Sequence, residues 1–183
     1  MEKEKKMLEE KGLSTTYLYR GRIINLRRDL VLPPGGGEPS FREIVEHPGA
    51  VAILALDQRG RVLLVRQYRR AAGRVLLEVP AGKLEPGEEP LACAQRELAE
   101  ETGCRGGKWR KLTWFYSTPG FCDEKIHLFL AEGVTEGTPA ADPGEALEPL
   151  WLDLAAAQQA VLKGEINDAK TIIALQFAAS LTA

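Results

Sequence analysis

The chain has little cysteine and little histidine for its 183 residues. Its three cysteines, Cys93, Cys104 and Cys122, are odd in number and lack CxxC spacing, so neither a disulfide framework nor a zinc site is expected. His47 and His127, the two histidines, lie too far apart in the sequence to suggest a histidine metal centre. This cysteine usage predicts a reducing, cytoplasmic setting.

Long apolar runs and a strong net charge are also missing. No segment reaches the roughly 18–20 apolar residues of a membrane span, and the charged start MEKEKKMLEEKG lacks the apolar core of a signal peptide. The formal net charge of −2 gives no reason to expect nucleic acid or an anionic membrane as a partner. What remains is the composition of a globular protein, with 44% hydrophobic and 27% charged residues.

Strand-forming patterns dominate the first half of the chain. Within residues 15–47, TYLYRGRIINLRRDLVL and FREIVEH flank PPGGGEP, which predicts an N-terminal β-hairpin with its turn at the glycines. AVAILAL, residues 50–56, is apolar throughout and is typical of a strand buried on both faces. After a turn at DQRG, VLLVRQYR at residues 62–69 is expected as its partner, and a short strand follows at Val75–Val79.

Helical signals appear in the second half. A helix over Pro90–Thr102 is expected because Pro90 suits a first helical turn and Gly103 suits the left-handed position after the last one. Further strands are expected at Lys111–Ser117, Lys125–Ala131 and Pro149–Leu152, and helices at Leu154–Lys163 and Asp168–Leu181, the second capped by Asn167 or Asp168. This order predicts an α+β fold with helices layered on a mixed sheet.

The first of these helices carries Glu97, Glu100 and Glu101 on one face, with Arg96 one turn before Glu100. Like charges at these spacings destabilise a helix by about 0.2–0.5 kcal/mol per pair. Either the three carboxylates form a solvated acidic face, or they bind a hard divalent cation such as Mg²⁺ or Mn²⁺. The helix alone does not decide between the two.

A glycine-rich loop, GKLEPGEE, leads into this helix. Loop and helix together read GKLEPGEEPLACAQRELAEETGC over residues 82–104. The characteristic positions are Gly82, Glu88, Arg96, Glu97, Leu98, Glu100, Glu101, Gly103 and Cys104. They match the Nudix box at every fixed position, and the chain therefore resembles a Nudix hydrolase. The resemblance implies an α/β/α sandwich with a mixed β-sheet, and hydrolysis of a nucleoside diphosphate linked to another group.

The resemblance also implies roles within the box. Glu97 and Glu101 would be the principal ligands of Mg²⁺, or of Mn²⁺, with Glu100 and the backbone carbonyl of Ala81 as further ligands. Such a cation would neutralise diphosphate charge and activate the attacking water. The other fixed residues would be structural: Gly82 makes the turn, Arg96 and Glu88 hold the loop, and Gly103 ends the helix.

The resemblance covers nearly all of the chain past residue 15 and looks like the ADP-ribose pyrophosphatase branch of the family. The matching segments are YRGRIINLRRDLV, REIVEHPGAVAILAL, LLVRQYRRAAGRVLLEVPAGKLEPGE, STPGFCDEKIHLFLA and INDAKTIIALQ. One marker of that branch is a proline about fifteen residues past the box, which here is Pro119 in STPGF. Pro119-Gly120 alone would indicate an ordinary turn, but with the box upstream both residues are expected to contact substrate.

Four more residues are expected near the substrate from the same resemblance. Arg69, in the arginine-rich strand end RQYRR, would grip a phosphate through two hydrogen bonds, although such a cluster is also typical of a solvated strand edge. Glu78 would accept hydrogen bonds from a ribose or base, and Arg27 would contact the adenine end. Glu124 would either position the substrate or support its own loop.

The general base is expected in the acidic loop EGTPAADPGEALEPLW, which offers Glu145 and Glu148. Glu145 fits better, because it stands six residues before Trp151 and follows Asp142-Pro143-Gly144. Glu148 lies against a proline at an expected strand start. The loop has fewer consecutive acids than is common in the branch, so both residues stay candidates.

Residues 1–47 are expected to form an N-terminal antiparallel β arm, and residues 48–183 the Nudix catalytic domain. Related enzymes of this branch are homodimers whose N-terminal strands help to build the partner's site. An apolar, strand-rich arm is consistent with such a homodimer, and equally with an arm that covers its own subunit.

Three functions are compatible with these residues. The first is Mg²⁺-dependent hydrolysis of ADP-ribose to AMP and ribose 5-phosphate. The second is hydrolysis of another nucleotide sugar, such as GDP-mannose. The third is a non-catalytic Nudix-like ligand sensor, which tends to lose box carboxylates and to need an effector domain. Because every box carboxylate is present and no segment suits an effector domain, the first function is favoured.

Overall fold

The structure is a computed structural model that describes residues 8–139 and 146–182, with side chains described as far as Ser180. The chain forms two compact units. The N-terminal unit comprises the described residues up to Pro48 together with Tyr116–Glu124, and the larger unit comprises Gly49–Phe115 and the described residues from Lys125 onward. Each unit is described by itself.

The N-terminal unit is built on a three-stranded antiparallel sheet of β1 (Lys11–Arg20), β2 (Asn25–Leu32) and β3 (Ser40–Glu46). The expected hairpin is therefore incomplete, because the segment taken as one long strand folds back on itself. The turn is closed by the Gly21 N–H, which donates to the Ile24 carbonyl at 2.9 Å. The turn was missed because GRII, between the two strands, contains two isoleucines, which favour a strand.

The larger unit contains a mixed sheet of seven strands. Its main path runs β10-β5-β4-β9-β8, with β6 paired to β5 and β7 paired to β4. β4 and β9 are parallel, whereas β5 pairs antiparallel with β4, β6 and β10. The strands are β4 (Ala50–Leu56), β5 (Arg61–Arg69), β6 (Arg74–Glu78), β7 (Ala81–Lys83), β8 (Arg105–Tyr116), β9 (Lys125–Thr135) and β10 (Leu147–Asp153).

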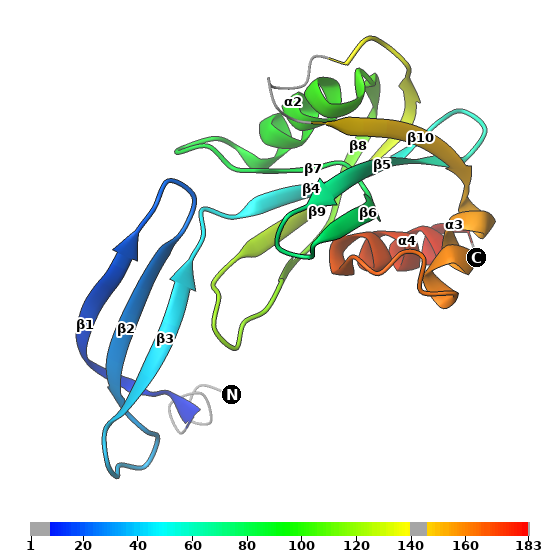
Figure 1. The fold of residues 1–183 in the computed structure, drawn as a ribbon. Helices are drawn as coiled ribbons and strands as arrows, with labels where there is room; N and C mark the ends of the chain where they lie inside the picture. Colours follow the sequence, from blue (N-terminus) through cyan, green and yellow to red (C-terminus); the bar gives the residue numbers. More distant parts are fainter. Residues whose placement is uncertain (1–7, 140–145, 183) are drawn as a thin grey trace. The chain divides into compact units, whose positions relative to one another are not determined.

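Three helices cover the two faces of this sheet (Figure 1). α2 (Pro90–Thr102) packs on one face, while α3 (Leu154–Leu162) and α4 (Ala169–Thr182) pack on the other. Alternate residues of β4 enter the two cores, so Ile53 lies with the α2 residues and Leu54 with those of α3 and α4. The predicted α+β sandwich with a mixed sheet is confirmed. No helix in the described part of the chain is long and apolar enough to cross a membrane.

Most expected elements of the larger unit are present, with different ends. α2 has the predicted bounds, and Gly103 follows it with φ of 72° and its N–H bonded to the Ala99 carbonyl. β8 begins at Arg105, six residues before the expected start, and this added stretch contains Gly106 and Gly107, which are poor strand formers. β7 was not expected as a strand, since its sequence AGK contains a glycine.

The sheet forks at the point where the box begins. β4 and β5 are paired where Leu56 faces Val62. Beyond this pair the two strands separate, and β6 pairs with β5 while β7 pairs with β4. The chain between Glu78 and Ala81 therefore crosses from one branch of the fork to the other. The crossing places the start of the box between the two helical layers.

Candidate active site

Arg96 holds the box loop against α2. Its Nε and Nη2 donate hydrogen bonds to the two carboxylate oxygens of Glu88, each at 2.9 Å. These bonds lower the pKa of Glu88 to about 2, so the carboxylate is ionised throughout the ordinary pH range. The geometry agrees with the prediction that the two residues tie the loop to the helix.

The same arginine relieves the crowding of acidic side chains on α2. Its Nη1 donates to Glu97 Oε1 at 2.9 Å and to Glu100 Oε2 at 3.0 Å. The bonds to Glu88, followed by the charges of its other partners, raise the pKa of Arg96. One guanidinium therefore compensates three carboxylates, and the helix remains intact despite their repulsion.

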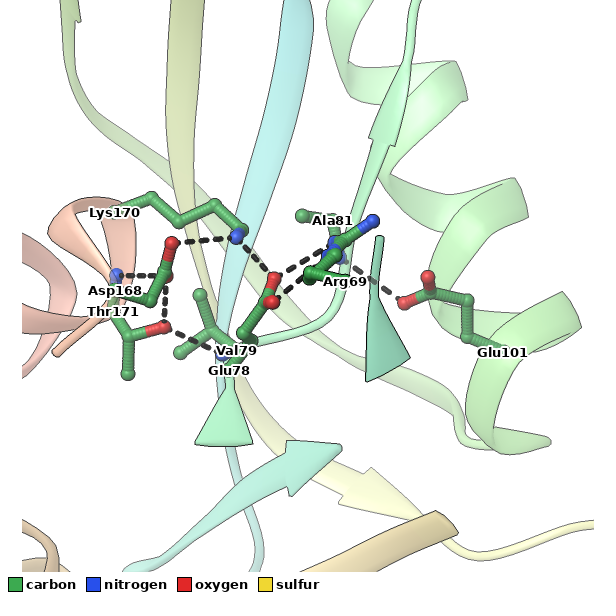
Figure 2. A network of polar contacts seen from close by, with 8 residues as sticks. All are labelled: Arg69, Glu78, Val79, Ala81, Glu101, Asp168, Lys170 and Thr171. Carbon is green, nitrogen blue, oxygen red and sulfur yellow. Dashed lines mark hydrogen bonds and ion pairs between the residues drawn. The ribbon is translucent and has the colours of Figure 1, made fainter. Parts of the chain in front are cut away.

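Glu101 contacts the backbone at the point where the sheet forks. Its side chain is buried, and its Oε2 accepts a hydrogen bond of 3.1 Å from the Ala81 N–H (Figure 2). The next residue, Gly82, lies beside Glu97, because a Cβ atom at Gly82 would overlap the Glu97 carboxylate. Gly82 is part of β7 and does not have a positive φ, so the turn predicted for it is wrong. The glycine is needed for close approach.

The donor set of the box suits a hard divalent cation. Glu97, Glu100 and Glu101 offer carboxylate oxygens only, which are the ligands that Mg²⁺ and Mn²⁺ prefer. The overlap at Gly82 shows how closely the loop backbone approaches Glu97. As placed, these side chains bond to Arg96 and Ala81, and within the described residues no set of three acidic, histidine or cysteine side chains is arranged as a metal cluster.

Arg69 and Glu78, predicted separately as substrate contacts, are bonded to each other (Figure 2). Nε and Nη2 of Arg69 each donate to one oxygen of Glu78 at 2.8 Å. Glu78 also accepts a bond from Lys170. Burial by itself would raise the pKa of Glu78, which is 1% exposed, but its bonds to Arg69 and Lys170 outweigh burial and lower it.

The first turn of α4 completes this network. Sequence analysis named Asp168 as a candidate cap but missed the contacts of Lys170 and Thr171. Asp168 Oδ2 accepts bonds from the N–H of Thr171 at 3.0 Å and from its hydroxyl at 2.6 Å, so Asp168 caps the helix. The Thr171 hydroxyl in turn accepts the Val79 N–H at 2.9 Å. Lys170 offered one signal, since a cation in a first helical turn opposes the helix dipole and needs an acidic partner.

Four predicted residues, Arg27, Pro119, Gly120 and Glu124, lie in the N-terminal unit. Arg27 pairs with Asp29 at 2.5 Å and with a glutamate of β3 at 3.0 Å. Pro119 and Gly120 line a groove of about 460 Å³ together with Arg27. Glu124 Oε1 lies 3.6 Å from Nδ1 of the neighbouring histidine, residue 47.

Of the two candidates for the general base, Glu148 lies within the described residues. Glu148 lies in β10, is 67% exposed, and accepts a bond of 2.9 Å from Arg66 Nη1 on β5. Arg66 therefore has its partner on the neighbouring strand, β10. Glu145 lies outside the described residues.

Fold and box together define a Nudix protein, and comparison with known families agrees. The model of the NUDIX domain matches residues 46–175, and the chain belongs to the Nudix hydrolase family. The predicted resemblance is thereby confirmed. Enzymes of this family generally use a divalent metal ion.

Relatives with different names match almost the whole chain. It is 45% identical to the ADP-ribose pyrophosphatase of Bacillus subtilis (strain 168), and 43% identical to the methanol dehydrogenase activator of Bacillus methanolicus. Each match covers 94% of both chains. The GDP-mannose pyrophosphatase of Klebsiella pneumoniae is 36% identical over 93% of this chain and 89% of its own.

Proposed function

We propose that this protein hydrolyses the diphosphate bond of ADP-ribose to give AMP and ribose 5-phosphate. The observation that carries the proposal is the complete box, in which Arg96, Glu88 and the buried Glu101 are held in defined positions. The choice of ADP-ribose is supported by the higher identity to a named ADP-ribose pyrophosphatase, 45%, than to a named GDP-mannose pyrophosphatase, 36%.

The proposed cofactor is Mg²⁺, with Mn²⁺ as a substitute. Glu97 and Glu101 would bind it, and Glu100 and the carbonyl of Ala81 would complete the protein ligands. When bound, the cation neutralises diphosphate charge and lowers the pKa of a water molecule. Arg96 orients Glu97 and Glu100 through hydrogen bonds, and the Ala81 N–H orients Glu101 in the same way.

Arg69 is the proposed contact to the diphosphate. Its side chain is 40% exposed, and a guanidinium can bind phosphate oxygens through two parallel hydrogen bonds. Glu78 has both oxygens engaged and is 1% exposed, so we assign it to orienting Arg69 instead of to direct contact with ribose. Arg27 is the proposed contact at the adenine end, and Pro119, Gly120 and Glu124 are further proposed substrate contacts.

Glu145 is proposed as the general base, with Glu148 as the alternative.

The protein is further proposed to be a cytoplasmic homodimer. Its proposed partner is the small nucleotide substrate, and neither nucleic acid nor a membrane is proposed as a partner. Support for the homodimer comes from exposed apolar side chains on β1, which include Leu13 and Leu18. Sedimentation equilibrium of the purified protein would test it, and a monomer at micromolar concentration would contradict it.

The substrate is tested by comparing kcat/KM for ADP-ribose, GDP-mannose, UDP-glucose and NADH in the presence of Mg²⁺. ADP-ribose is expected to give the highest value, and a higher value for GDP-mannose would overturn the choice.

Glu101→Gln should abolish turnover while the circular dichroism spectrum stays that of the wild type. An unchanged rate in this variant would refute the role of Glu101.

A further inference from the structure

The tripeptide Val79–Ala81, which crosses the fork of the sheet, is held from three sides. Pro80 has no N–H, so the tripeptide has two backbone donors. The Val79 N–H donates to Thr171 Oγ1 at 2.9 Å, and the Ala81 N–H donates to Glu101 Oε2 at 3.1 Å. The Pro80 carbonyl accepts the Ile53 N–H at 2.9 Å. The crossing thus connects α4, on one face of the sheet, with α2 on the other.

Thr171 is well suited to fix this crossing. It is 0% exposed, and its hydroxyl proton is donated to Asp168 Oδ2 at 2.6 Å. The hydroxyl lone pairs are therefore left to accept the Val79 N–H. Because Val79 is also buried, at 1% exposed, its N–H would be costly to leave without an acceptor.

The residue before the tripeptide is attached to the same helical turn. Lys170 Nζ bonds to Glu78 Oε2, and also to Asp168 Oδ1 at 3.0 Å. Figure 2 shows the resulting path, from Asp168 and Thr171 through residues 78–81 to Glu101. Glu78 ends β6, and Val79 begins the crossing. These two consecutive residues are bonded to Lys170 and Thr171, which are consecutive residues of α4.

We propose that Thr171 is a positioning residue for the metal site. Its hydroxyl fixes the Val79 peptide, which sets the place of the Ala81 N–H and carbonyl, and thereby the orientation of the Glu101 carboxylate. Thr171 acts from the opposite face of the sheet and touches neither metal nor substrate. The inference rests on the proposed role of Glu101 as a metal ligand.

The test is Mn²⁺ binding to nucleotide-free protein, measured as the electron paramagnetic resonance signal of free Mn²⁺. Thr171→Val keeps the shape of the side chain but removes the hydroxyl. It should raise the Kd for Mn²⁺ about tenfold, equivalent to about 1.4 kcal/mol. Thr171→Ser keeps the hydroxyl and should bind Mn²⁺ as the wild type does.

Ile166→Val is the control for general loosening. Ile166 is buried in the core beneath α3 and α4 and makes no side-chain hydrogen bond, so this variant should lose thermal stability without losing Mn²⁺ affinity. Equal weakening by Ile166→Val and Thr171→Val would overturn the inference, as would wild-type affinity in Thr171→Val. If Thr171→Val does not fold, Asp168→Ala removes the oxygen that accepts the hydroxyl proton, and wild-type affinity in that variant overturns the inference.

Glu101→Gln separates this inference from the metal assignment on which it rests. This variant should lose most of its Mn²⁺ affinity. If it binds Mn²⁺ as the wild type does, both the assignment and the role of Thr171 are overturned. If it loses affinity and Thr171→Val does not, the role of Thr171 alone is overturned. Neither result depends on which nucleotide the enzyme hydrolyses.

Discussion

The Ala81 N–H and the Glu101 carboxylate, twenty residues apart in sequence, are joined by a hydrogen bond of 3.1 Å. This bond links β7 to α2 at the point where the box begins. The three acidic residues of the helix therefore have different partners. The Arg96 guanidinium bonds to Glu97 and Glu100, whereas a backbone N–H orients Glu101. The helix therefore presents its acidic face in a fixed arrangement.

Gly82→Ala is expected to damage catalysis far more than folding. The backbone of Gly82 is extended, so alanine fits its φ and ψ, but the new Cβ would overlap the Glu97 carboxylate. A displacement of about 1 Å at a catalytic group costs on the order of 10²-fold in rate. We expect kcat/KM to fall by about that factor, with Tm lowered by only a few degrees.

Gly12→Ala is the matched control for this substitution. Gly12 also lies in a strand, and a Cβ atom there would meet nothing within 4 Å. Its activity should equal that of the wild type. Wild-type activity in Gly82→Ala would show that Glu97 moves aside without consequence and would contradict the close-approach explanation.

The box was predictable because its signals are local. Pro90 and Gly103 mark the ends of α2, and the spacing of acidic residues places them on one face without knowledge of any other element. The reason for Gly82 was not predictable, since it depends on contact with Glu97, which is fifteen residues away and comes close only after β7 pairs with β4.

Long-range contacts account for what sequence analysis missed at the site. Thr171 and Val79 are 92 residues apart, and nothing in the sequence around either residue points to the other. Arg69 and Glu78 were each predicted by resemblance to contact substrate, and their contact with each other was missed. They are not cross-strand partners, since Arg69 faces Arg74 and Glu78 faces Val65 in the β5–β6 pairing, so two long side chains must reach along the folded hairpin to meet.

Glu88→Gln should change the dependence of stability on acid. The pKa of Glu88 is lowered from 4.5 to about 2 by its bonds to Arg96, so the unfolded chain binds the proton more readily than the folded one. The contribution of Glu88 is complete above pH 4.5 and is lost as the pH falls toward about 2. At pH 7 the free energy of unfolding should be higher for the wild type than for Glu88→Gln by on the order of 2 kcal/mol. This difference should shrink below pH 4.5.

Urea unfolding at several pH values measures this difference. Glu148→Gln is the control, because its pair with Arg66 is exposed and should contribute less than about 1 kcal/mol. A difference between wild type and Glu88→Gln that stays constant from pH 7 down to pH 3 would refute the stabilising role of the Arg96–Glu88 pair.

Lys170→Met should destabilise the protein through Glu78. The buried carboxylate would keep Arg69 as a partner but lose its second cation, at a cost of about 2 kcal/mol, less than for a buried charge left wholly unpaired. Glu78→Gln/Lys170→Met should be more stable than the sum of the two single changes predicts. Urea unfolding of the four proteins gives the coupling energy, expected at about 1–2 kcal/mol, and strict additivity would contradict the ion pair.

The two candidate bases are distinguished by Glu145→Gln and Glu148→Gln. Removing a general base lowers kcat by about 10²–10⁴-fold, because the attacking water is no longer deprotonated in the transition state. We expect a loss of that size for Glu145→Gln and a change of no more than about threefold for Glu148→Gln, whose carboxylate is bonded to Arg66 at the sheet edge. Initial rates at saturating substrate and Mg²⁺ provide the measurement. Arg66→Gln should match Glu148→Gln if that pair is structural, and a large loss confined to Glu148→Gln would transfer the role of base to Glu148.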